Sequence, residues 1–549
     1  MDGYYDLGSF GRPITTENAD AQTWFNRGLT WAYGFNHRES AECFEKAISC
    51  DPSCAIAYWG LAFSLGPNYN KEWKLFDQED LKVTTKRTYD ASRKAKAYIE
   101  NASSIERALV DAIQIRYQTD SPVSMQEYAL QDRAYADSME SVYRRFGDDL
   151  DVAALYADAL MQLTPWKLWD LHTGQPTPGA RTLEAKTVLE KALKHKNAKH
   201  HPGLLHLYIH MAEMSPNPEH GLNAADHLRD LVPDAGHLRH MPSHLDILVG
   251  DYRRAIASNY QAILADEEFL RRRGAHNLYS FYRMHDYQSL IYAAMFAGKK
   301  DVALEMVDQM EGTLPEDALR IESPPLADWL ETFKAVRFHV MIRFGMWDEL
   351  TRIDLPSDQN LYCVTTATAH YAKGVAWAAL GNVQEAERER TLFHESLKHV
   401  SPTRLDFPVK CVDILAVGVV MLDGEIEYRR GNYKQAFEHL RKSVDLDDGL
   451  DYSEPWGWMQ PARHAYAALL LEQGHLQEAA DVYKADLGLG GAPTAANQHP
   501  NNVWALQGYH ECLIRLGRTV EADLIKPQLK VAVAVADIPI RSSCFCRVD

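Results

Sequence analysis

The sequence predicts an all-α fold in which helical hairpins stack into an α-solenoid superhelix. Two observations carry this prediction. Several stretches repeat one order of features, namely a helix of small residues, a turn containing glycine and an amphipathic helix. Segments that alternate apolar and polar residues, as strands do, are nearly absent. At 549 residues the chain is long enough for one extended repeat array, and the stretches between repeats predict irregular insertions.

The first expected hairpin lies within residues 24–52, where Gly28 belongs to the first helix, Ala47 to the second, and Pro52 ends the unit. The same pattern predicts further hairpins within residues 204–233, 238–266, 372–393, 423–448 and 466–487. Over most of residues 20–525 it resembles the tetratricopeptide repeat, which is a helix–turn–helix unit. Such repeats form a concave groove lined by the first helix of each hairpin.

The repeats also predict how the chain is organised. We expect an N-terminal extension (1–20), an N-terminal array that contains a histidine cluster (21–305), a connecting insertion (306–362), a C-terminal array (363–526) and a tail (527–549). In the tail, Cys544 and Cys546 form a Cys-x-Cys pair that can bind Cu(I) or zinc, or cycle as a disulfide.

Composition narrows the class of protein. The formal net charge of −18 argues against a nucleic-acid partner, because a surface that neutralises phosphates is basic. No run of about 18 apolar residues predicts a membrane span, and no secretory signal is visible at the start of the chain. Eight cysteines in so long a chain favour thiols over a disulfide framework. We therefore expect a soluble, cytoplasmic protein without a membrane partner.

Histidines are concentrated in one segment. Residues 201–244 contain eight of the 23 histidines, where about two would follow from an even distribution. They include two His-x-x-x-His pairs, His206 with His210 and His240 with His244. A separation of four residues places both imidazoles of a pair on one face of a helix, as a chelating pair requires.

The two pairs are separated by one tetratricopeptide period, so they occupy equivalent positions on the first helices of consecutive repeats. In tetratricopeptide proteins these positions face the groove. His237 lies one turn earlier on the same stripe, and matching Gly250 to Gly298 superposes His285 on His237. Neighbouring helices pack about 10 Å apart, so imidazoles from both can reach one ion.

The pattern predicts His206, His210, His240 and His244 as metal ligands, with His237 and His285 ligating or moving protons. Glu213 can act as a further ligand, an orienting residue or a general base. An imidazole-rich set suits copper, iron, zinc or nickel, and four or five histidines exceed what a hydrolytic zinc needs. Copper or non-haem iron is therefore favoured, and zinc remains open. A peptide-binding or pH-sensing surface is the alternative use of such a cluster.

Several further stretches resemble a bacterial and fungal group of tetratricopeptide proteins with paired His-x-x-x-His motifs. They are residues 35–41, 57–70, 155–170, 201–210, 237–244, 282–287 and 501–513. The resemblance implies the fold and a shared groove site but no particular reaction. In the relatives the stretch matching Arg283–Asp286 reads Pro-His-Asn followed by a second histidine, and this chain departs from that pattern. Polar and aromatic residues in these stretches can line a substrate pocket, namely His37, Asn68, Asn70, Trp166, Trp169 and Tyr282.

Together these observations favour a metal-dependent enzyme, an oxidoreductase or oxygenase that acts with dioxygen on a small organic molecule in the groove. No GxGxxG, GxxxxGK[ST], GxSxG or HExxH motif points to another catalytic class. Two alternatives stay open. One is a scaffold that binds a peptide or protein without catalysis, and the other is a zinc-dependent hydrolase or lyase.

Overall fold

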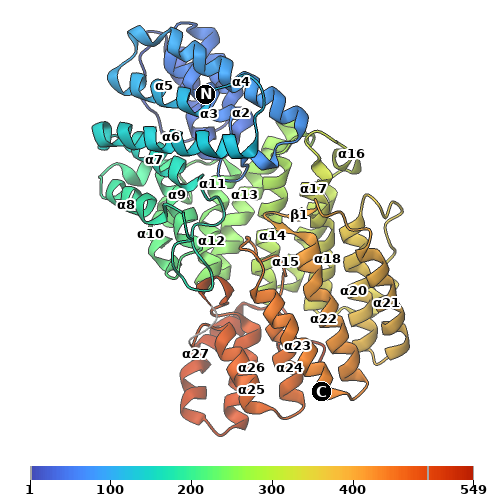
Figure 1. Ribbon diagram of the computed structural model, residues 1–549. Helices are drawn as coiled ribbons and strands as arrows, with labels where there is room; N and C mark the ends of the chain where they lie inside the picture. The colour runs from blue at the N-terminus through green and yellow to red at the C-terminus, as the bar shows by residue number, and fades with distance from the viewer. Residues whose placement is uncertain (1–2, 491–493, 548–549) are drawn as a thin grey trace. The chain divides into compact units, whose positions relative to one another are not determined.

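The computed structural model describes residues 3–490 and 494–547 and is almost entirely helical (Figure 1). The outermost residues of the expected N-terminal extension and C-terminal tail lie outside this part of the chain. In the described residues, regular sheet is limited to the short antiparallel pair β1 (Leu405–Asp406) and β2 (Val409–Lys410). The all-α array of helical hairpins predicted from the sequence is confirmed.

Contacts between residues divide the chain into two compact units. Unit 1 comprises Met1–Leu245 and Leu264–Glu268, and unit 2 comprises Asp246–Ile263 and Phe269–Asp549. By this division the helices α12 (Pro242–Leu248) and α13 (Tyr252–Arg273) each contribute residues to both units.

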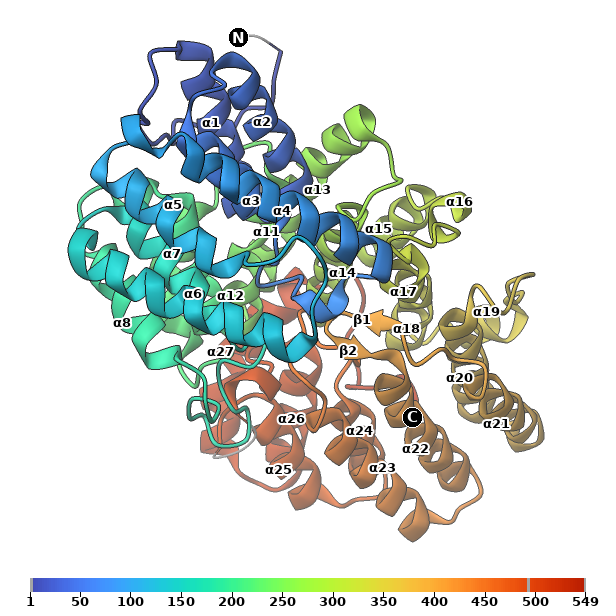
Figure 2. The same cartoon turned by 45° about the horizontal axis from the view of Figure 1, so that its top comes forward.

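Unit 1 is built from helices that pack against their neighbours in chain order, as α1, α2 and α3 do (Figure 2). Besides its parts of α12 and α13, its elements are α1 (Ala19–Tyr33), α2 (His37–Cys50), α3 (Ala55–Leu65), η1 (Trp73–Leu75), α4 (Gln78–Ala97), η2 (Ile99–Asn101), α5 (Ser104–Arg116), α6 (Met125–Phe146), α7 (Leu150–Met161), α8 (Thr182–Leu193), η3 (Ala198–His200), α9 (Pro202–Glu213), η4 (Pro218–Gly221), α10 (Leu222–Leu228) and α11 (Gly236–His240).

Unit 2 continues with paired helices, and short helices occupy the stretch expected as a connector. Its further elements are α14 (Ser280–Phe296), α15 (Lys300–Gly312), α16 (Glu316–Leu319), α17 (Leu326–Leu330), η5 (Glu331–Ala335), α18 (Val336–Arg343), α19 (Trp347–Arg352), α20 (Cys363–Ala379), α21 (Val383–Leu397), α22 (Cys411–Arg429), α23 (Tyr433–Asp448), α24 (Ala462–Glu472), α25 (Leu476–Asp486), η6 (Ala495–Asn497), α26 (Val503–Arg515) and α27 (Thr519–Val535).

Seven of the turns between consecutive helices share one backbone conformation. Each has a glycine with a positive φ, which any other residue adopts at a steric cost, and the next N–H donates to the carbonyl five residues earlier. In the α22–α23 turn, Gly431 has a φ of 81°, and Asn432 N donates to Glu427 O at 3.0 Å. The glycines of this turn type are Gly250, Gly298, Gly345, Gly381, Gly431, Gly474 and Gly517.

The turn glycines provide a test of this account. Gly431→Ala should lower the free energy of unfolding by about 1–2 kcal/mol, because a Cβ is strained at positive φ even though no heavy atom lies within 4 Å of it. Gly312→Ala, at the end of α15 with an equally open environment and an ordinary φ, should instead raise stability by about 0.5–1 kcal/mol. Urea unfolding followed by circular dichroism measures both, and equal effects of the two variants would contradict the explanation.

No helix among the described residues combines the length and apolar character needed to cross a membrane. The composition favoured thiols for all eight cysteines, and this is wrong for two of them, because Cys544 and Cys546 form a disulfide. The other six, Cys43, Cys50, Cys54, Cys363, Cys411 and Cys512, are free.

Candidate metal centre

Helix α9 supplies the first histidine pair. It starts at Pro202, whose fixed φ suits the first helical position, and His201 caps it by accepting the Leu204 N–H at Nδ1, 3.2 Å away. His206 and His210 follow one turn apart and therefore point from the same face. Both side chains are completely buried.

The second histidine segment is an interrupted helix. His237 and His240 lie on α11, which ends before Met241, and His244 lies on α12, which starts at Pro242. Proline has no N–H to continue the hydrogen-bond ladder, which explains the break at this position. All three histidines are buried.

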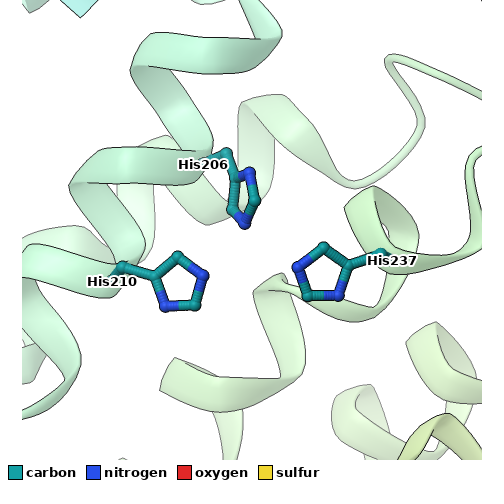
Figure 3. Close-up of side chains that lie close together, drawn as sticks. All are labelled: His206, His210 and His237. Carbon is teal, nitrogen blue, oxygen red and sulfur yellow. The ribbon is translucent and has the colours of Figure 1, made fainter. Parts of the chain in front are cut away.

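The structure places three imidazoles around a common space. His206 and His210 of α9 face His237 of α11 (Figure 3), and one ligand nitrogen from each lies within 4.8 Å of the others. The ring centroids are 4.7 Å apart for His206 and His210, and 4.9 Å apart for His206 and His237. This group can hold a metal ion. His237 completes this group with the α9 pair, and the assignment of His240 and His244 as ligands of the same ion remains a prediction.

His206 has the protonation state and the ring orientation that a metal ligand requires. Its Nδ1 lies 2.6 Å from the carbonyl oxygen of Tyr33, and because a carbonyl only accepts, Nδ1 carries the proton. The lone pair is therefore on Nε2, which is buried and has no hydrogen-bond partner among the described residues. Burial lowers the pKa of His206 to about 3, against the opposing effect of the Tyr33 hydrogen bond, so the ring is neutral at physiological pH.

Glu213 links the two histidine segments. Its Oε1 lies 2.9 Å from His210 Nδ1, and its Oε2 lies 2.7 Å from His244 Nδ1. A carboxylate that accepts from both Nδ1 atoms leaves Nε2 of each ring as the ligand nitrogen. One ligand atom each from His210, Glu213 and His244 also lies within 4.8 Å of the others, so a second group shares His210 with the first. Glu213 is therefore placed to orient the imidazole rings of His210 and His244.

The pair His240 and His244 differs from the first pair. Their Nε2 atoms lie 2.6 Å apart, the distance of a very short hydrogen bond. Two nitrogens bound to one tetrahedral ion with bonds of 2.0–2.1 Å would be about 3.3 Å apart. As placed, these two rings are hydrogen-bonded to each other, and the His206, His210 and His237 group is the better candidate for an ion.

Aromatic rings surround the three imidazoles. The Phe35 ring centroid lies 4.4 Å from that of His206, 5.8 Å from His210 and 5.7 Å from His237. Tyr69 lies 4.9 Å and Trp166 6.1 Å from the His210 ring. These rings bury the imidazoles, and electrostatic interactions are stronger in a buried site than in water.

Phe35 was missed by the sequence reasoning, although a signal existed. It closes the α1–α2 turn with a φ of 55°, and Asn36 N donates to Trp31 O at 3.0 Å, as in the glycine turns. Phe35-Asn36 therefore stands where Gly381-Asn382 and Gly431-Asn432 stand in their hairpins. A phenylalanine in this conformation costs about 1–2 kcal/mol, and such strain is retained where the side chain has another role.

The other predicted pocket residues of unit 1 contact or position the aromatic residues around the three imidazoles. Asn68 Oδ1 accepts the Asn70 N–H at 2.8 Å, which shapes the loop that carries Tyr69. Trp169 Nε1 donates to Met211 O at 2.8 Å and fastens its loop to α9. His37 Nδ1 donates to Ser64 O at 2.8 Å, and burial lowers its pKa to about 4, so it packs as a neutral ring near Phe35.

Two predicted site residues belong to unit 2. His285 and Tyr282 lie on α14. The His285 ring stacks on Phe281 with a centroid distance of 5.9 Å, and Tyr282 packs between Tyr279 and Phe281. Their proposed parts in proton transfer and substrate binding remain predictions.

Comparisons with known proteins add little to this site. No family model matches the sequence, and no curated protein matches it. The structure of Naa15/Naa10 bound to HypK-THB is 14% identical, with 94% of this chain and 70% of that chain covered and a TM-score of 0.22. The crystal structure of the yeast Tom70 is 13% identical, with 93% and 92% covered and a TM-score of 0.28. Likenesses with such TM-scores carry no conclusion about the function of this chain.

Proposed function

We propose that unit 1 binds one transition-metal ion through His206, His210 and His237, and that the protein is a metal-dependent enzyme. The single observation that carries this proposal is the buried group of three imidazoles in which His206 Nε2 has no hydrogen-bond partner among the described residues. Leaving a buried polar nitrogen unpaired costs about 1–3 kcal/mol, and an ion would remove that cost.

The residues around the site suggest how it would work. Three neutral imidazoles suit copper, iron or zinc, and they leave coordination positions for a small substrate. When bound, a copper or iron ion would supply redox chemistry with dioxygen, which is the reaction we favour. Glu213 would hold the His210 ring in its ligating orientation, and Phe35, Tyr69 and Trp166 would exclude water. His240 and His244, with a proton between them, would provide a proton store beside the site.

The proposal is tested by the metal content of the untagged protein, expressed in medium that contains copper, iron, zinc, nickel and manganese. We expect about one ion per chain by plasma emission analysis, which the three-histidine group implies. Less than about a tenth of an ion, with no uptake on dialysis against each metal, would overturn it.

The same preparation separates the two alternatives. A scaffold would be free of metal and would bind a peptide or protein through its stacked hairpins. A hydrolase or lyase would contain zinc and stay active without dioxygen, whereas the oxidative enzyme would lose turnover under anaerobic conditions.

A further inference from the structure

The C-terminal segment is fastened to unit 2 by specific contacts. Lys300 N donates to Asp537 Oδ1 at 2.7 Å where the segment leaves α27. Ser543 Oγ donates to the carbonyl of His464 in α24 at 2.8 Å, and the Arg429 guanidinium of α22 donates to the carbonyl of Cys546. The Cys-x-Cys pair is therefore held in place against α22 and α24 of its own unit.

The disulfide between Cys544 and Cys546 lies opposite a buried carboxylate. Glu425 of α22 is 1% exposed, and its Oε2 has no hydrogen-bond partner among the described residues. One ligand atom from each of Glu425, Cys544 and Cys546 lies within 4.8 Å of the other two. Burying this carboxylate oxygen without a hydrogen-bond partner costs free energy, and a cation bound beside it in another redox state of the cysteine pair would remove that cost.

Cys544 borders a solvent-accessible hollow. Cys544, Phe545 and Arg547 line a hollow of about 610 Å³ together with Phe344 and Trp347. Cys544 is 9% exposed and Cys546 is fully buried, so a small reductant can approach one sulfur of the bond. Attack on one sulfur is sufficient, because thiol–disulfide exchange proceeds through a mixed disulfide.

We propose that Cys544, Cys546 and Glu425 form a redox-controlled site for a thiophilic metal ion of the Zn²⁺ type. An external dithiol would reduce the bond, so that two electrons and two protons convert the disulfide to two thiols while the dithiol becomes a disulfide. The ion would then displace the two thiol protons and bind two thiolates and the Glu425 carboxylate. In the reverse step an external disulfide would accept the two electrons and, with two protons from solvent, become two thiols, while the sulfur bond closes and the ion is released. This site is independent of the histidine centre.

The test is a titration of the full chain with Co²⁺, which replaces Zn²⁺ and reports sulfur ligands by a thiolate-to-cobalt charge-transfer band in the near ultraviolet. The chain is reduced with a phosphine, which is then removed under anaerobic conditions. We expect the band after reduction, with an amplitude that corresponds to one thiolate-bound Co²⁺ per chain, and its absence from the oxidised chain. The oxidised protein is a control with the same sequence, so the result does not depend on how a variant folds.

Variants assign the ligands. Cys544→Ser/Cys546→Ser should abolish the band, and Glu425→Gln should weaken Co²⁺ binding by about 10–100-fold. The other closely spaced pair provides the matched control, since Cys50→Ser/Cys54→Ser should leave the band unchanged, as should His206→Ala/His237→Ala. Absence of the band from the reduced native chain, its persistence in Cys544→Ser/Cys546→Ser, or unchanged affinity in Glu425→Gln would overturn the proposal.

Discussion

Replacing His206 and His237 together with alanine is expected to reduce the bound metal from about one ion per chain to background. The two substitutions leave only His210 of the three-imidazole group, and one imidazole cannot hold an ion against buffer ligands. The rings come from two different helices, so the loss would establish that both contribute to one site. Metal content after dialysis is the measurement, with circular dichroism to verify that the helices remain.

The second histidine pair supplies the matched control. His240→Ala/His244→Ala also removes two buried imidazoles from this region, but we expect it to retain the ion, because these rings contact each other through their Nε2 atoms. Glu213→Gln should retain the ion with an affinity lower by about 10–100-fold, since an amide has one accepting oxygen for two Nδ1 donors. If His240→Ala/His244→Ala loses the metal whereas His206→Ala/His237→Ala retains it, the ion is bound by His240 and His244 instead.

Asp151→Ala is expected to cause a large loss of stability in unit 1, about 3 kcal/mol. The Asp151 side chain is buried and accepts from three groups, Arg12 Nη1 at 2.8 Å, the Tyr33 hydroxyl at 2.7 Å and His201 Nε2 at 3.1 Å. Removing it leaves these donors buried without their acceptor, although Arg12 keeps Asp149. Because Arg12 keeps this partner, we expect a loss of stability at the lower end of the range for breaking a buried ion pair.

The loss of stability caused by Asp151→Ala should become smaller as the pH falls. Burial alone would raise the pKa of Asp151, but His201, Arg12 and the Tyr33 hydroxyl outweigh burial and hold it well below its usual value. The folded state therefore binds the Asp151 proton less tightly than the unfolded state, whose aspartate pKa is about 3.9. The stabilisation is fully present above that pH and is lost as the pH falls below it, so the difference between native protein and Asp151→Ala should narrow in acid.

Urea unfolding at several pH values tests this, with hydrogen exchange of peptides from unit 1 to locate the change. Asp148→Ala, three residues earlier and exposed, is the control and should change stability by less than about 0.5 kcal/mol. A difference of less than about 1 kcal/mol between Asp151→Ala and the control at neutral pH would contradict the role assigned to the network.

Local patterns determined the helical part of this protein. Glycine followed by a polar residue, as in Gly431-Asn432, stops one helix and starts the next, because both the turn and its hydrogen bond lie within a few residues of chain. The spacing of His206 and His210 likewise placed both rings on one face of α9, since the helical period is fixed by the backbone. Features that depend only on nearby residues were therefore predictable.

The composition of the site was decided by contacts between distant segments. The repeat period singled out His240, yet His237 joins His206 and His210. The helix that carries His237 and His240 breaks at Pro242, and packing then determines where the imidazole rings point. Phe35 covers the three rings from a turn near the start of the chain, and Glu425 faces a cysteine pair near its other end. No local pattern encodes such proximity, which results from how side chains fill the space between helices.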